Sequence, residues 1–314
     1  MRDITTTLER LQAKKHRGLA LAASFARLGY EDRAKLVLDC GTYLGIVDQG
    51  EGARIVDANF CRQRLCPACS WRRSLRIYST TSQILDHLDK TQGKAIKYLF
   101  LTLTIRNIPL TTLGQALDDM AAAFKRLTNN RAWTRRVRGC MRTLEITINH
   151  DTMQAHPHYH LILAVNRSYA TKGDKTYWRH EDWQAAWAKA ARLDYAPQVS
   201  IERVKGTREQ GVAEVSKYIA KDSDYIIDSM AAQMGTEEAE AATDYIVGQL
   251  MHQLHGRRLV SYTGLLRQAQ QALRLTNPED GPLTDTIRGD ITQAIKRYHW
   301  SAGLGRYVPG LPSD

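Results

Sequence analysis

Three histidines alternate with other residues in the string 156–160, which reads His-Pro-His-Tyr-His. Side chains alternate between the two faces of a β-strand, so His156, His158 and His160 share one face if the string is extended. Glu145 lies upstream in a second alternating segment, and facing residues on antiparallel strands lie about 4.5–5.5 Å apart at Cβ. If residues 149–155 connect the two strands, Glu145 falls opposite His158 or His160. Two imidazoles and one carboxylate could then share a divalent ion, although parity alone does not say which two histidines bind.

These residue types allow two other interpretations. A polar sheet face would carry histidine and glutamate without binding any ion, and two histidines with one carboxylate are also the ligands of non-haem iron oxygenases. The formal net charge of +11 argues against a small-molecule oxygenase. A basic protein attracts polyanions, and nucleic acid is the commonest polyanion.

A second group of reactive side chains recurs at helical spacing between residues 209 and 225. Its members, at i, i+4, i+7 and i+11, are Glu214, Tyr218, Lys221 and Tyr225. A tyrosine hydroxyl on such a helix could attack a phosphodiester that a divalent ion polarises. Lys221 could stabilise the developing charge, and Glu214 could activate water or accept a proton. The alternative is a solvated helix face on which these side chains only aid solubility.

Four of the five cysteines could form a metal site. Cys61, Cys66 and Cys69 lie within nine residues, and Cys40 lies about twenty residues upstream. Structural zinc is bound by four ligands in a tetrahedron, so Cys40 is the natural fourth ligand. An odd number of cysteines in a cytosolic protein argues against disulfides, and the alternative is a set of buried free thiols. Cys140 is expected to be an ordinary buried residue.

The segments that carry these motifs have recognisable periodicities. Alternating apolar residues predict strands over residues 98–105, 141–148 and 158–165, and a short strand over 199–204. Helical spacing predicts helices near 113–127 and 183–190. The order β-α-β-β-α-β predicts an α+β fold, with an antiparallel sheet that has helices on one face and leaves the other free for a ligand.

Composition divides the chain into four expected segments. They are a helical N-terminal segment (1–35), a cysteine segment (36–95), a catalytic domain (96–230) and a helical C-terminal region with a tail that is in part irregular (231–314). No apolar run is long enough to cross a bilayer, and the N-terminus lacks the pattern of a secretory signal. We therefore expect a soluble, cytoplasmic protein without a membrane partner.

As an ordered set, the motifs resemble the plasmid rolling-circle replication initiators of the HUH endonuclease superfamily. The set comprises Phe100-Leu-Thr-Leu-Thr104, the histidine string and the tyrosine segment. The most similar branch also carries a Cys-x4-Cys-Pro-x-Cys segment, here 61–69, and a C-terminal region like residues 254–264. The resemblance covers about 40–264.

The resemblance implies a fold and a catalytic site. The fold is an RRM or ferredoxin-like antiparallel sheet with flanking helices, a small zinc knuckle and helical extensions. His158, His160 and Glu145 would bind Mg²⁺ or Mn²⁺, and Tyr218 would be the nucleophile. Glu214 would activate water for the terminating cleavage, and Zn²⁺ would occupy the cysteine cluster.

The resemblance also implies partners. The protein would bind the double-strand origin of a plasmid, nick a single-stranded site in a hairpin through a 5′-phosphotyrosine intermediate, and work with a host helicase. Candidate DNA contacts are Arg72, Arg73 and Arg76 beside the cysteines, with a solvated surface as the alternative, and Tyr225 as a helix-face or stacking residue. The rival hypotheses are a non-catalytic zinc-knuckle DNA-binding regulator and a relaxase or single-tyrosine transposase.

Overall fold

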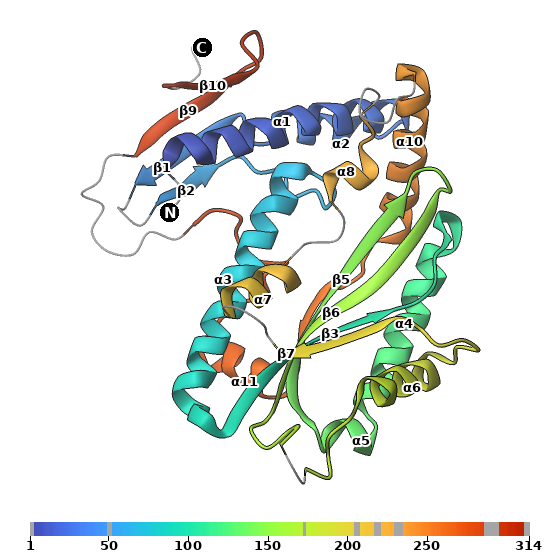
Figure 1. The fold of residues 1–314 in the computed structure, drawn as a ribbon. Coiled ribbons are helices and arrows are strands. Elements are labelled where there is room, and N and C mark those ends of the chain that lie inside the picture. Colours follow the sequence, from blue (N-terminus) through green and yellow to red (C-terminus); the bar gives the residue numbers. More distant parts are fainter. Residues whose placement is uncertain are drawn as a thin grey trace. The chain divides into compact units, whose positions relative to one another are not determined.

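The chain folds into two units, each assembled from separate stretches of sequence (Figure 1). The computed structural model describes residues 3–48, 52–171, 174–203, 208–216, 221–228, 235–285 and 295–310. The first unit comprises Met1–Arg73, Tyr225–Gly248 and Pro282–Asp314, and the second comprises Ser74–Asp224 and Gln249–Gly281. The expected segments 36–95 and 231–314 therefore each contain residues of both units. No helix in the described part of the chain is both long and apolar enough to span a membrane.

An antiparallel six-stranded sheet forms the centre of the second unit. The strand order is β7-β3-β6-β5-β8, and β4 pairs with β6 beside this path. The bounds are β3 Ile96–Thr104, β4 Ile108–Pro109, β5 Val137–Asn149, β6 Gln154–Asn166, β7 Val199–Arg203 and β8 Val260–Tyr262. The predicted strands are confirmed, and β5 and β6 extend several residues beyond the predicted ends.

Helices cover the apolar face of this sheet, as the alternation of residues predicts. They are α4 (Leu113–Thr128), the short α5 (Arg131–Thr134) and α6 (His180–Ala191). Tyr159 of β6 points into this layer, with ring centroids 5.7 Å from Phe124 of α4 and 6.4 Å from Trp187 of α6. Trp187 is fully buried. The expected α+β fold, with an antiparallel sheet and flanking helices, is confirmed.

The opposite face of the sheet is not free along its whole length, which corrects the expectation above. Helix α3 (Pro67–Gln92) enters the second unit at Ser74, and its Thr81 Oγ1 lies 2.9 Å from the hydroxyl of Tyr262 in β8. The same Oγ1 lies 3.3 Å from the sulfur of Met141 in β5. Met141 alternates with Thr143 and Glu145, so α3 packs on the face that carries the proposed ligands.

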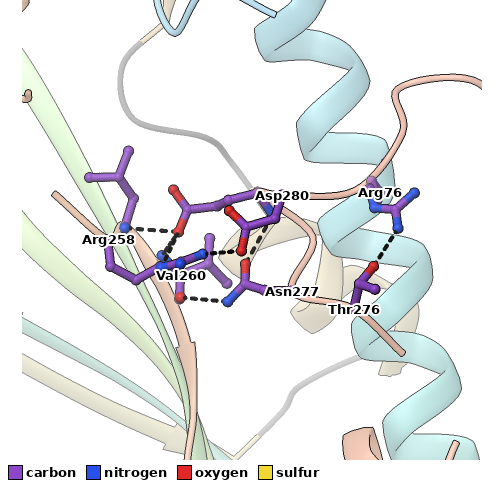
Figure 2. A network of polar contacts seen from close by, with 8 residues as sticks. Arg76, Arg258, Val260, Thr276, Asn277 and Asp280 are labelled. Carbon is purple, nitrogen blue, oxygen red and sulfur yellow. Dashed lines mark hydrogen bonds and ion pairs between the residues drawn. The ribbon is translucent and has the colours of Figure 1, made fainter. Parts of the chain in front are cut away.

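The β8 edge of the sheet is closed by the segment that follows α11 (Gly264–Ala272) (Figure 2). The Glu279 carboxylate accepts hydrogen bonds from the backbone N–H groups of Leu259 (3.0 Å) and Val260 (2.9 Å). The Asn277 amide donates to the Val260 carbonyl at 3.3 Å. Edge strands present unpaired backbone groups, and here side chains pair with some of them. Strand β8 lies in the C-terminal region that was expected to be helical and was not predicted.

The first unit contains a four-stranded sheet of two hairpins, in the order β10-β9-β1-β2. The strands are β1 Tyr43–Asp48, β2 Ala53–Ala58, β9 Lys296–Ser301 and β10 Arg306–Pro309, and the helices at its N-terminal end are α1 Ile4–Arg27 and α2 Glu31–Asp39. Helix α10 (Thr236–Gln253) joins α1 through the ion pair of Arg27 with Asp244 at 2.7 Å. Helix α1 and the first half of α2 lie in the N-terminal segment that was predicted to be helical. The hairpin in the tail, which was expected to be in part irregular, was not predicted.

Candidate functional site

The predicted ligands lie on adjacent strands of the six-stranded sheet. Glu145 of β5 pairs directly with His158 of β6, which pairs on its other side with Thr104 of β3. His160 lies two pairs further along, on the same face, between Thr143 and Thr102. The hairpin is tighter than expected, because pairing continues to Asn149 and Gln154 and only residues 150–153 form the connection. The expected sharing of one face by Glu145, His158 and His160 is thus present.

The three side chains converge on one point. Nε2 of His160 lies 2.8 Å from Oε2 of Glu145, and Nε2 of His158 lies 3.4 Å from the same oxygen. All three potential ligand atoms lie within 4.8 Å of one another, so this group could hold a metal ion. The side chains are nearly buried, with 7% to 9% of each residue exposed.

The other nitrogen of each ring is held by an oxygen outside this group. Nδ1 of His158 lies 3.0 Å from the His156 carbonyl, and Nδ1 of His160 lies 3.2 Å from the hydroxyl of Thr102. Such outer partners fix the orientation of an imidazole and leave its second nitrogen for a metal. His156 itself contributes its backbone to this arrangement, and its ring centroid lies 5.3 Å from that of His158.

The charge at this point suits a cation. Burial acts to raise the pKa of the Glu145 carboxyl, but hydrogen bonds with His158 and His160 and their charge outweigh burial and hold the pKa well below its ordinary value. Glu145 is therefore ionised at neutral pH. Two imidazoles and one carboxylate form a ligand set that can bind a divalent ion.

The tyrosine segment is described only in part. Tyr218 lies outside the described residues, as does the side chain of Glu214, whose backbone belongs to α7 (Arg208–Val215). Helix α7 contacts β6, and its Val212 and Val215 are buried. The predicted packing of an apolar stripe is therefore present one turn before Tyr218. Lys221 is exposed and directly precedes α8 (Asp222–Tyr225).

A contact that the sequence analysis did not foresee ties this segment to the sheet. Nε2 of His150, in the β5–β6 connection, lies 3.1 Å from the carbonyl of Asp224. Burial raises the pKa of the Asp224 carboxyl, and the charge of Glu145 raises it further. Asp224, six residues after Tyr218, thus lies within electrostatic reach of Glu145.

The four cysteines of the first unit form a second compact group. Sγ of Cys40 lies 3.5 Å from Sγ of Cys66 and 3.6 Å from Sγ of Cys69, and Cys61 Sγ lies 3.7 Å from Cys69 Sγ. Sulfurs bound to zinc at about 2.3 Å in a tetrahedron are about 3.8 Å apart, whereas disulfide sulfurs are about 2.05 Å apart. The spacing fits a shared ion, and all four thiols are free.

Backbone groups support this cluster. The N–H of Cys61 donates to Cys40 Sγ at 3.4 Å, and that of Arg62 donates to Cys69 Sγ at 3.2 Å. Hydrogen bonds from Cys40 and Cys61 lower the pKa of Cys66, which favours a thiolate. Cys140 stands apart, fully buried beside Thr263, as expected.

Several residues proposed to contact DNA are instead used inside the protein. Arg72 and Arg73 are each 6% exposed. Arg72 donates to the Leu283 carbonyl and pairs with Asp285, and Arg73 donates to the carbonyls of residues 62 and 63.

Tyr225 is 1% exposed, and its hydroxyl donates to the Leu65 carbonyl at 2.6 Å. We therefore correct the expectation that Arg72, Arg73 and Tyr225 contact DNA. Arg76 is half-buried and bonds to Thr276 (Figure 2).

Comparison with known proteins finds one family. A family model described as "Replication protein" (Rep_1) matches residues 52–308. A "Protein rep" of Streptococcus pneumoniae serotype 2 (strain D39 / NCTC 7466) is 32% identical over 280 residues, which cover 88% of this chain and 83% of the relative. A "Protein rep" of Bacillus sp is 31% identical over 306 residues, with 91% and 95% covered. One of Lactiplantibacillus plantarum is 33% identical over 269 residues, with 83% and 81% covered. No solved structure is significantly similar to this chain.

Proposed function

Because the chain belongs to the Rep_1 replication protein family, we propose that it starts rolling-circle replication of a plasmid by nicking one strand at the origin. The observation that carries this proposal is the convergence of Glu145, His158 and His160 on one point of the sheet. The fold is proposed to be that of the HUH endonucleases, with residues 96–230 as the catalytic domain. The remaining partners in the proposal are a hairpin that exposes the nick site and a host helicase, in the cytoplasm.

The donor set fits a divalent ion. Glu145, His158 and His160 would hold Mn²⁺ or Mg²⁺, and the two imidazoles favour Mn²⁺, since Mg²⁺ prefers oxygen ligands. When bound, the ion would polarise the scissile phosphate. The four cysteines would hold Zn²⁺, to which thiolates bind well.

The chain's own residues would carry the transfer. The phenol oxygen of Tyr218 attacks phosphorus and gives up its proton to solvent, and the bond from phosphorus to the 3′ oxygen breaks, after which that oxygen takes up a proton from solvent. The products are a 5′-phosphotyrosine and a free 3′ hydroxyl that can prime synthesis. Lys221 stabilises the charge on the phosphate. At termination Glu214 takes a proton from water, which attacks the phosphotyrosine and releases Tyr218.

A labelled single-stranded origin oligonucleotide tests the proposal. With wild-type protein and Mn²⁺, we expect a labelled protein–DNA adduct on a denaturing gel, and none with EDTA. Origin binding without an adduct under any divalent ion would favour the rival hypothesis of a non-catalytic zinc-knuckle regulator.

Glu214→Ala should nick at a rate close to that of wild type but release DNA slowly at termination. The substitution removes the proposed base for water and leaves the nucleophile, so the adduct should persist at least about 10²-fold longer. A chase of the preformed adduct measures this lifetime. Glu209→Ala makes the same change five residues earlier in the sequence and is the matched control. Equal lifetimes for the two variants would remove Glu214 from the mechanism.

Cations at the end of the sheet away from the metal ligands offer a surface for DNA. This strand-end surface comprises the exposed Arg138, Arg167 and Arg203 and the half-buried Lys97. Ile96 pairs with Asn166, to which Arg138 donates at 3.1 Å, and Leu99 pairs with Arg203. Burial lowers the pKa of Lys97, and the charges of Arg203 and Arg167 lower it further. Among the described residues, no carboxylate forms an ion pair with Arg138, Arg167 or Arg203. We propose that phosphates of the origin duplex bind there.

The double variant Arg138→Ala/Arg167→Ala should weaken origin binding and reduce its salt dependence. Each lost phosphate contact lowers the slope of log K against log salt by about 0.9, so the slope should fall by about 1.8. Lys189→Ala/Arg267→Ala removes the same charge from exposed sites on α6 and α11 and should leave the slope unchanged. Equal slopes for both double variants would show that the strand-end surface does not bind DNA.

A further inference from the structure

A lysine is buried in the N-terminal helix of the first unit. Lys15, in the middle of α1, is only 3% exposed. It lies in the same helical stripe as Leu11, Gly18 and Ala22, all of which are buried. Lysine is almost never this buried unless its charge is compensated, because desolvating an ammonium group is costly. The surroundings of Lys15 must therefore supply negative charge.

The direct partners of Lys15 are carbonyl groups, which carry no net charge. Its Nζ donates to the carbonyl of Cys40 at 2.9 Å and to that of Leu38. Among the described residues, no carboxylate forms an ion pair with Lys15. The carboxylate of Asp39 is near enough to act on it, but Asp39 accepts a hydrogen bond from Thr42 at 3.1 Å on the exposed side. Two carbonyl oxygens thus accept hydrogen bonds from the Lys15 ammonium group, but neither compensates its positive charge.

The four-cysteine group is the concentrated source of negative charge beside Lys15. Burial lowers the pKa of Lys15, while charge on Cys40 and Cys66 acts to raise it. Four thiolates around a divalent ion carry a net charge of about −2. The guanidinium of Arg73, buried on the same knuckle, donates to the Gln63 carbonyl at 3.2 Å and to the Arg62 carbonyl. Lys15 and Arg73 are thus two buried cations that bond to the backbone of, or beside, the four-cysteine group, which would carry two negative charges when loaded.

We infer that Lys15 is the counter-cation of the four-cysteine metal centre, so that the centre holds α1 in place by charge as well as by hydrogen bonds. This inference rests on the proposal that the four sulfurs bind a divalent ion. Partners outside the ligand set commonly change metal affinity by about 10–100-fold when they are removed. Lys15 would act in this way through the backbone of Cys40 and through its charge.

The inference predicts that Lys15→Met weakens zinc binding in the loaded protein but does not lower the melting temperature of the stripped protein. In the zinc-loaded protein, Lys15→Met removes the charge that balances the thiolates, so zinc should be held at least about tenfold more weakly. In the reduced, zinc-stripped protein no ion holds all four cysteines as thiolates, so the buried ammonium loses most of this counter-charge. Lys15→Met should then melt no lower than the stripped wild type.

Three variants of the full-length protein test this. Lys15→Met removes charge and hydrogen bonds, Lys15→Gln keeps a donor for the carbonyls without the charge, and Lys35→Met makes the same change at an exposed site of α2. Two quantities are measured for each variant. The first is the transfer of zinc to a competing chelator, and the second is the melting temperature with and without that chelator. Lys15→Met and Lys15→Gln should both lose zinc at least about tenfold more readily than wild type and Lys35→Met.

Zinc retention by Lys15→Gln equal to that of wild type would overturn the inference, because hydrogen bonds and not charge would then explain Lys15. Retention by Lys15→Met equal to that of Lys35→Met would overturn it as well. Should Lys15→Met not fold, Lys15→Gln still decides the question. A wild-type protein that binds no zinc would instead overturn the proposed metal centre, which is a distinguishable result.

Discussion

Tyr218→Phe should abolish the covalent protein–DNA adduct and leave origin binding unchanged. The substitution removes one oxygen atom, the proposed nucleophile, and keeps the aromatic ring. Loss of a nucleophile lowers a rate by on the order of 10⁶-fold in well-studied cases, so no adduct should be detected. The measurement is the denaturing-gel assay with a labelled oligonucleotide and Mn²⁺, together with a binding assay on the same DNA.

Tyr225→Phe is the matched control, because it makes the same change seven residues along the predicted stripe. The hydroxyl of Tyr225 donates to the Leu65 carbonyl inside the first unit, so its loss should cost about 1 kcal/mol of stability. Adduct formation should survive. A normal adduct with Tyr218→Phe, or an adduct mapped to Tyr225, would show that Tyr218 is not the nucleophile.

His160→Gln should abolish metal-dependent cleavage without preventing DNA binding. Nε2 of His160 lies 2.8 Å from Glu145, and its Nδ1 is oriented by Thr102, so glutamine cannot reproduce the donor. Removal of a hydrogen-bond partner outside the ligand set commonly lowers activity by about 10–100-fold, and removal of the ligand His160 should lower cleavage by more than that. Cleavage is measured across a Mn²⁺ titration, with Mn²⁺ binding followed separately by electron paramagnetic resonance.

His156→Gln makes the same change on the neighbouring histidine of the string. His156 contributes its carbonyl to the orientation of His158, and a substitution of its side chain leaves that carbonyl in place. Its cleavage and Mn²⁺ affinity should stay within a few-fold of wild type. If His156→Gln lost as much as His160→Gln, the metal would be bound by a different pair of histidines.

The metal ligands could be predicted from the sequence because strand geometry is simple. Side chains on a strand alternate with a period of two, so His158 and His160 lie on one face. Glu145 on the neighbouring strand lies on the same face for any length of the connection, as long as the register does not shift by an odd number of residues. The predicted length of the connection was wrong, since a tight turn at 150–153 replaces the expected loop at 149–155. Turn geometry depends on backbone angles, such as the positive φ of Met153, which the residue type does not signal.

Other features could not be predicted locally. Strand β1 pairs with β9, about 250 residues away in the chain, and no periodicity within either segment indicates its partner. Helix α3 did leave a signal, because Ile77, Ile84 and Leu88 recur at helical spacing, but the cysteines beside it dominated the interpretation. Arg72 and Arg73 resemble a basic surface in the sequence, and only their contacts with backbone carbonyls reveal that they are buried.

The closure of β8 by Glu279 and Asn277 has a practical consequence for anyone who shortens this protein. A fragment that ends after residue 275 would retain every strand of the six-stranded sheet and every proposed ligand of the catalytic ion. It would, however, leave the N–H groups of Leu259 and Val260 as an open template to which a strand of another molecule can add. Such a fragment would be prone to self-association in a concentrated solution, and a minimal catalytic domain should therefore include residues 276–280.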